Sequence, residues 1–105
     1  MTALPDKLVA CVGFEWDRGN ADKNWQKHRV TRAEAEQVFF NRPILILPDE
    51  RHSKTEPRYA LLGQTNDGRL LTEVFTMKGK LIRVISARDM HRRERRFYEQ
   101  ASSKT

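Results

Sequence analysis

The chain has 105 residues, of which 38% are apolar and 32% charged, and its formal net charge is +6. This size suits one domain with a modest core. The sequence contains no run of about 18 apolar residues, so we expect no transmembrane helix. The lone cysteine, Cys11, excludes an internal disulfide and a cysteine-rich metal site. We therefore expect a cytoplasmic protein without a secretory signal or membrane partner.

The first part of the chain predicts a strand followed by two helices. Residues 1–12 are interpreted as an N-terminal extension, and the alternation of apolar and acidic residues over 14–17 predicts a half-buried strand. The spacing of apolar residues over 20–29 predicts a helix. A second helix is expected to start after Thr31, because Glu34 three residues later completes a capping box.

The second helix has a short apolar face and a definite end. Ala35, Val38 and Phe39 are expected to be buried together. Pro43 ends the helix, because proline disfavours the helical conformation in the residue before it. The apolar run at residues 44–47 then predicts a strand.

The second half of the chain predicts three further strands joined by tight turns. The expected strands span three ranges, 59–64, 70–76 and 81–86. Asn66-Asp67-Gly68 marks the first turn, since glycine tolerates the positive φ that such turns need. A second turn is expected at residues 77–80. Two hairpins indicate a sheet that is at least partly antiparallel.

The chain is expected to close with a basic helix. Asp89 is predicted to cap this helix, which runs to about Ala101 with Met90, Phe97 and Ala101 facing inward, before a frayed tail at residues 102–105. The element order β-α-α-β-β-β-β-α indicates one α+β domain over residues 13–101. Two N-terminal helices should pack on a mostly antiparallel sheet of four to five strands.

The positive charge is concentrated near the C-terminus. Residues 78–96 contain eight basic and two acidic residues, so this segment carries the whole net charge of +6. The eight are Lys78, Lys80, Arg83, Arg88, Arg92, Arg93, Arg95 and Arg96. Such clustering favours a polyanionic partner. The alternative is a solvated helix face stabilised by ion pairs.

Arg83 interrupts an otherwise apolar strand, Leu-Ile-Arg-Val-Ile. An arginine held rigidly on a strand is suited to bidentate phosphate binding, although an inward charge can also protect an edge strand from pairing. On the final helix, Arg88, Arg92 and Arg95 share a face with Glu99, and each arginine could neutralise an RNA phosphate.

Three further side chains are candidates for chemistry. A histidine side chain ordinarily titrates near neutrality, so His28 is a candidate for moving protons, although it also continues an apolar stripe and could be a core histidine. Lys27 beside it could contact a phosphate. Tyr98 could stack on a base or sit in the core. The histidines lack metal-ligand spacing, so we expect no metal or other cofactor.

Six segments taken in order give the chain a family resemblance. They are FEWD, NWQKHRV, TRAEAEQVF, ERHSKTEPRYALLGQT, GRLLTEVFT and IRVISARDMHRRERRFYE. Together they resemble the BrnT family, toxins of bacterial type II toxin–antitoxin pairs with a RelE-like ribonuclease fold. The resemblance implies an endoribonuclease that slows translation, a BrnA-like antitoxin that silences it, and promoter DNA bound only through the toxin–antitoxin complex.

The resemblance and the residue patterns together give two sets of site residues. The catalytic candidates are Lys27, His28, Arg83, Arg88 and Tyr98, and the RNA-binding candidates are Arg58, Arg92, Arg93, Arg95 and Arg96. Metal-free cleavage would use the RNA 2′-hydroxyl as nucleophile. Arg83 and Arg88, with Lys27, would hold the phosphate, while His28 or Tyr98 transfers protons.

Glu73 and Glu99 are weaker candidates for the general base. The alternative function is a non-catalytic basic module that binds nucleic acid, or a repressor subunit.

Overall fold

The computed structural model describes residues 13–49 and 57–103, and the predicted order of elements is confirmed there. The strands are β1 (Gly13–Glu15), β2 (Leu45–Pro48), β3 (Arg58–Gln64), β4 (Leu70–Lys78) and β5 (Leu81–Asp89). The helices are α2 (Arg18–His28), α3 (Arg32–Gln37) and α4 (Arg92–Ser103). The proposed extension at residues 1–12 lies outside the described residues. In the described part, no helix has the length and apolar character needed to cross a membrane.

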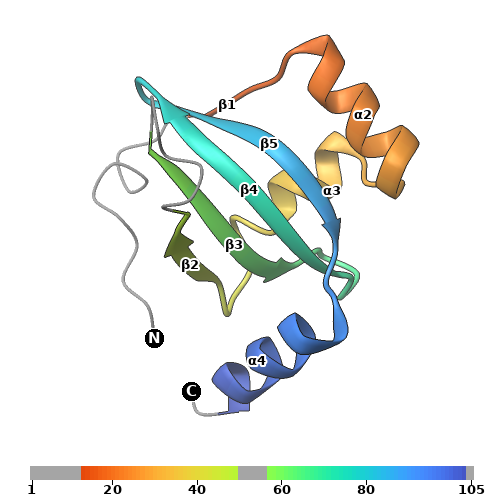
Figure 1. Ribbon diagram of the computed structural model, residues 1–105, viewed down its shortest axis with the longest axis vertical. Coiled ribbons are helices and arrows are strands. Elements are labelled where there is room, and N and C mark those ends of the chain that lie inside the picture. Colours follow the sequence, from red (N-terminus) through yellow and green to blue (C-terminus); the bar gives the residue numbers. More distant parts are fainter. Residues whose placement is uncertain (1–12, 50–56, 104–105) are drawn as a thin grey trace.

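The five strands form one mixed sheet in the order β1-β5-β4-β3-β2. Strand β1 pairs with β5 in parallel, and the three other pairings are antiparallel. Figure 1 shows α2 beside β5 and α4 beyond the lower end of the sheet. The prediction of an α+β fold with a mostly antiparallel sheet is therefore confirmed.

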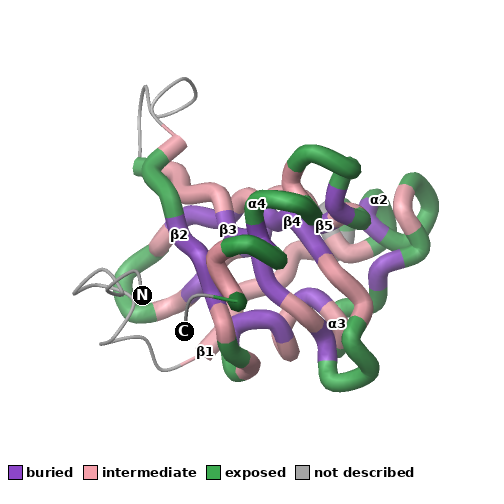
Figure 2. Tube along the Cα trace, turned by 90° about the horizontal axis from the view of Figure 1, so that it is seen from below, coloured by how far each residue is buried: buried purple, intermediate pink, exposed green. Residues whose placement is uncertain are grey.

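The two faces of the sheet are covered differently, because successive side chains on a strand point to opposite faces. Leu71 and Phe75 of β4 belong to the main core, which contains Val38 of the helical segment. A smaller cluster on the other face joins Leu62 to Tyr98 of α4. We call this second face, which carries Thr72, Val74 and Thr76 of β4, the open face. Figure 2 shows that buried segments run through the strands while α4 is largely exposed.

The start of α3 agrees in detail with the sequence. The N–H of Glu34 donates to Thr31 Oγ1 at 3.1 Å, and the N–H of Thr31 donates to Glu34 Oε1 at 3.1 Å, so the predicted capping box is present. Ala35, Val38 and Phe39 are buried in the main core as expected.

The first predicted hairpin is also confirmed. Gly68 has a φ of 85°, and its N–H donates to the carbonyl oxygen of Thr65. The second hairpin is tighter than predicted, because β4 continues to Lys78 and only Gly79 and Lys80 form the turn.

The beginning and orientation of α4 differ from the prediction. Asp89 does not cap the helix, since β5 extends through it by pairing with Leu71. The N–H of His91 instead donates to Glu94 Oε1 at 2.8 Å, and α4 starts at Arg92, two residues later than a cap at Asp89 predicts. The face that α4 packs on the sheet also differs: Tyr98 is buried, while Phe97 is 52% exposed and was wrongly assigned to the core. The prediction that Met90 and Ala101 face inward is confirmed.

Candidate functional site

Two arginines lie in one row across the open face. Thr76 of β4 pairs with Arg58 of β3 on one side and with Arg83 of β5 on the other. Directly opposed residues in antiparallel strands point to the same face, so both side chains leave the sheet on the open face, where the Nε of Arg58 is buried. Neighbouring strands are about 4.8 Å apart, so the Cα atoms of Arg58 and Arg83 are separated by about 10 Å.

A third arginine reaches the open face because β5 is irregular. In a regular strand, Arg83 and Arg88 would point to opposite faces, since they are an odd number of residues apart. Here Phe75 pairs with Val84 but Val74 pairs with Ser86, so β5 carries one extra residue. Such a bulge reverses the alternation beyond it, and Arg88, opposite Thr72, returns to the face of Arg83.

Arg83 is held by a carboxylate near the edge of the sheet. Its Nη2 donates to Asp17 Oδ2 at 2.9 Å, and the arginine side chain remains 34% exposed. Asp17 follows β1, which pairs in parallel with the start of β5. The parallel pairing therefore sets the direction in which this guanidinium points.

Arg88 is fixed between β5 and the first turn of α4. Its two terminal nitrogens donate to the two oxygens of Glu94 at 2.8 Å and 3.0 Å. Glu94 also accepts hydrogen bonds from Thr72 Oγ1 and from the N–H of His91. The hydrogen bonds from Arg88 are the main reason that the pKa of Glu94 falls to about 2, so this carboxylate stays ionised and keeps Arg88 oriented.

The remaining predicted RNA-binding arginines lie along α4. Arg92, Arg93, Arg95 and Arg96 are all exposed. Arg93 borders a groove on the open face, and it lines a neighbouring hollow together with Arg92 and Arg96. The helix therefore adds positive charge next to the end of the sheet that carries Arg88.

Lys27 and His28 end α2, which packs against β5. Lys27 is exposed and His28 half-buried. The end of α2 lies close to Asp89, because Arg69 Nη2 donates both to the backbone oxygen of His28 at 3.0 Å and to Asp89 Oδ2 at 3.1 Å. Asp89 pairs with Leu71 and points away from the open face, so Lys27 and His28 lie at the covered side of this sheet end, apart from the row of Arg83.

Tyr98 and Glu73 are both buried. The Tyr98 hydroxyl donates to the carbonyl oxygen of Pro43 at 2.7 Å, and burial raises its pKa. Glu73 lies on the face opposite the open face, in the same alternation as Leu71 and Phe75, and it is fully buried. Neither side chain, in this conformation, presents a free proton-transfer group to the open face. Glu99, by contrast, is exposed on α4.

Three structurally important side chains were not identified from the sequence. Glu94 had a local signal, because a glutamate three residues after His91 fits the end of a capping box. Asp17 and Arg69 had none, since their contacts are distant along the chain. Arg69 donates to Asp89 at 2.7 Å and to Glu34 at 3.2 Å, which raises the pKa of Arg69 and joins the β4–β5 end to α3.

The same arginine also fixes the end of α2. Its terminal nitrogens donate to the backbone oxygens of His28 at 3.0 Å and Arg29 at 2.8 Å. Arg29 has a φ of 54°, an uncommon conformation for a residue with a side chain. Arg69 thus holds together the turn that positions His28.

Within residues 13–49 and 57–103, no three His, Cys, Asp or Glu side chains gather as metal ligands. The open face itself presents guanidinium groups that are oriented by carboxylates, as in the pairs Arg83–Asp17 and Arg88–Glu94. Such an arrangement can bind phosphodiester groups and stabilise negative charge that develops on them.

Comparison with known proteins identifies a family and a similar fold. A family model described as the ribonuclease toxin BrnT of type II toxin–antitoxin systems matches residues 16–94. The crystal structure of the Brucella abortus ribonuclease toxin BrnT is similar, with a TM-score of 0.58 and 20% sequence identity over 76% of this chain and 97% of that chain. At this identity the structural likeness supports a shared fold. No curated protein sequence matches the chain.

Proposed function

Because the chain belongs to the BrnT family of ribonuclease toxins from type II toxin–antitoxin systems, we propose that it is an endoribonuclease that inhibits translation until an antitoxin binds it. One observation carries this proposal beyond the family: Arg58, Arg83 and Arg88 project from the same open face of the sheet. An RNA strand crossing that face would meet all three, with the arginines of α4 at one end.

Cleavage would proceed by attack of a 2′-hydroxyl on the adjacent phosphorus, with departure of the 5′-oxygen. Arg83 and Arg88 would bind the non-bridging oxygens, since guanidinium groups remain charged and carry five N–H donors. Asp17 and Glu94 act as positioning residues. Because they already hold the arginines, little reorganisation is needed as charge builds on the phosphate, which is the condition for effective electrostatic stabilisation.

The placement of the proton-transfer candidates favours His28 over Tyr98. His28 is half-buried at the end of α2, on the covered side of the sheet end that carries Arg88, so an RNA strand must extend past this end to reach it. Tyr98 would first have to release the carbonyl of Pro43 and leave its buried position. Lys27, exposed next to His28, would contact a phosphate that extends past the end of the sheet.

A second candidate function is a binding module without turnover. The exposed arginines of α4 favour it, because they can bind phosphates while Arg83 and Arg88 stay paired with Asp17 and Glu94. Phosphate binding is common to both functions, so only turnover separates them.

Cleavage of a 5′-labelled RNA in the presence of EDTA tests the proposal. We expect products ending in a 2′,3′-cyclic phosphate, and no cleavage at a position where the RNA carries a 2′-deoxy sugar. Arg83→Ala should lower the single-turnover rate about 100-fold or more while the protein stays folded. Arg32→Ala is the matched control, since this exposed arginine lies on α3 and covers Trp16.

Two results would contradict parts of this proposal. A wild-type rate for Arg83→Ala would remove that residue from the site. Tight RNA binding by the purified protein without any shortening of the RNA would establish the binding module instead.

A further inference from the structure

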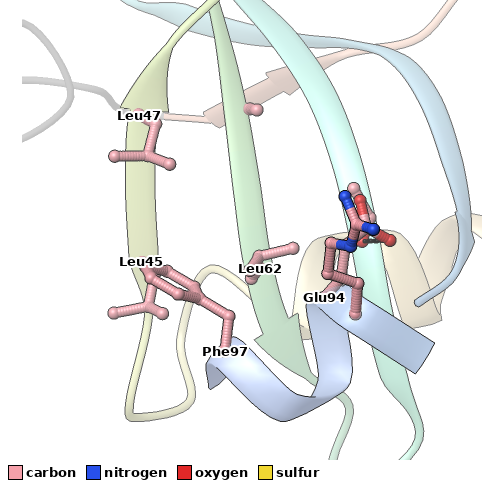
Figure 3. Close-up of a pocket in the computed structure, with 8 residues that line it drawn as sticks. Leu45, Leu47, Leu62, Glu94 and Phe97 are labelled. Carbon is pink, nitrogen blue, oxygen red and sulfur yellow. Dashed lines mark hydrogen bonds between the residues drawn. The ribbon is translucent and has the colours of Figure 1, made fainter. Parts of the chain in front are cut away.

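An apolar groove crosses the open face beside α4. It has a volume of about 350 Å³ and is lined by Leu45, Leu47, Ala60, Leu62, Thr72, Arg93, Glu94 and Phe97. Figure 3 shows Leu45 and Leu47 on β2, Leu62 on β3 and Phe97 extending from α4 toward Leu45. The groove therefore separates the last helix from the edge of the sheet.

Two large apolar side chains of this groove face solvent. Leu47 is 50% exposed and Phe97 is 52% exposed. Phe97 has this exposure although the neighbouring Tyr98 is buried against the sheet. Neighbouring apolar groups left in contact with water on a small protein are typical of a surface that a partner covers.

The chemistry of the lining favours a protein partner over a nucleobase. Four of the lining side chains are aliphatic. The polar groups of the floor are already engaged, since Thr72 Oγ1 donates to Glu94 and Glu94 accepts from Arg88. A base would find one aromatic ring and few hydrogen-bonding groups to read its edges, whereas leucine-sized side chains would find a matching apolar surface.

The border of the groove is basic. Arg93 lines it, and Arg92 and Arg96 line the adjoining hollow with Arg93. A partner that fills the groove must therefore carry carboxylates beside its apolar side chains. An amphipathic helix provides this arrangement, with apolar residues at i, i+3, i+4 and i+7 and acidic residues flanking them.

We propose that this groove is the docking site for an acidic amphipathic helix of the antitoxin, with Leu47 and Phe97 as its main anchors. The inference rests on the proposed pairing of this chain with an antitoxin. The groove ends at Glu94, the partner of Arg88. A helix seated there would cover the open face next to Arg88 and exclude an RNA strand, so docking and inhibition follow from one contact.

The test measures two properties of the same variants. Leu47→Ser, Phe97→Ser and the control Phe40→Ser are compared for binding to the protein encoded by the reading frame next to the toxin's, and for metal-free RNA cleavage. Phe40 is the matched control because it is 74% exposed and packs against Phe14, away from the groove. Thermal unfolding checks that every variant is folded.

We expect Leu47→Ser and Phe97→Ser each to weaken the complex about 30-fold or more, the loss typical of a central anchor, and to retain cleavage. Phe40→Ser should bind as tightly as the wild type. Unchanged affinity in both groove variants overturns the docking site, as does lost cleavage with unchanged affinity, which would assign the groove to RNA. If the groove variants weaken the complex but no form of the protein cleaves RNA, the docking site stands and the nuclease fails.

Discussion

Replacing Glu73 should stabilise the protein, and increasingly so as the pH rises. Its side chain is fully buried on β4, and neither carboxylate oxygen has a hydrogen-bond partner. Burial raises the pKa of Glu73 well above its ordinary value of 4.5. Glu73→Met removes the polar group and fills a similar volume beside Leu71 and Phe75.

The structure sets both the size and the direction of the effect. A buried polar group without a partner costs about 1–3 kcal/mol, so Glu73→Met should raise the free energy of unfolding by about 2 kcal/mol even where the carboxyl is protonated. The folded state holds the proton of Glu73 more tightly than the unfolded state does. The stability that comes from this tighter proton binding is fully present below pH 4.5, and the wild-type protein loses it as the pH rises toward the folded pKa of Glu73. The loss is about 1.4 kcal/mol per pH unit in that interval.

Urea unfolding at several pH values between 4 and 8 measures this directly. The wild-type protein should lose stability above pH 4.5 relative to Glu73→Met, so the gap between the two proteins should widen with pH. Glu99→Gln is the control, because Glu99 is exposed on α4 and its removal should leave the pH profile of the wild type unchanged.

The reasoning would be refuted by parallel pH profiles of the wild type and Glu73→Met. That outcome would mean that Glu73 has a partner or access to water in solution. A Glu73→Met protein less stable than the wild type at pH 8 would be equally contradictory, because it would show that the carboxylate contributes a favourable interaction.

Two further substitutions test contacts around the site. Arg69→Met removes the hydrogen bonds to Asp89 and Glu34 and should lower the free energy of unfolding by about 2 kcal/mol at pH 7, measured in urea. Both carboxyls have lowered pKa values, so this loss should shrink as they are protonated in acid. An equal loss at pH 7 and pH 2 would contradict the ion pairs. Tyr98→Phe removes the hydrogen bond to Pro43 and should lower the free energy of unfolding by about 1 kcal/mol without changing the rate of RNA cleavage. A cleavage rate about 100-fold lower would instead show that Tyr98 takes part in proton transfer.

The predicted elements that agreed best with the structure have short-range causes. The capping box at Thr31 and the turn at Gly68 each depend on a few neighbouring residues. The start of α4 was misplaced because Asp89 is a good helix cap in isolation. In the folded protein its carboxylate accepts hydrogen bonds from Arg69, twenty residues away, and β5 continues through it.

The candidate site likewise combines features that the sequence predicts with features that depend on the folded structure. The sequence indicated arginines in a basic segment, and the family resemblance pointed to Arg58, Arg83 and Arg88. The common face of Arg83 and Arg88 could not be predicted, because it depends on one extra residue in β5. The apolar groove was equally hidden, since Leu47 and Phe97 are fifty residues apart and Phe97 was expected in the core.

The sequence by itself determined the order of strands and helices, the α+β class and the segment that carries the net positive charge. These features follow from local periodicity, turn residues and composition. Only the tertiary structure decided which arginines share a face, which carboxylates hold them and where apolar side chains remain exposed. Those outcomes depend mainly on strand register and on contacts between segments that are distant along the chain, which local patterns do not encode.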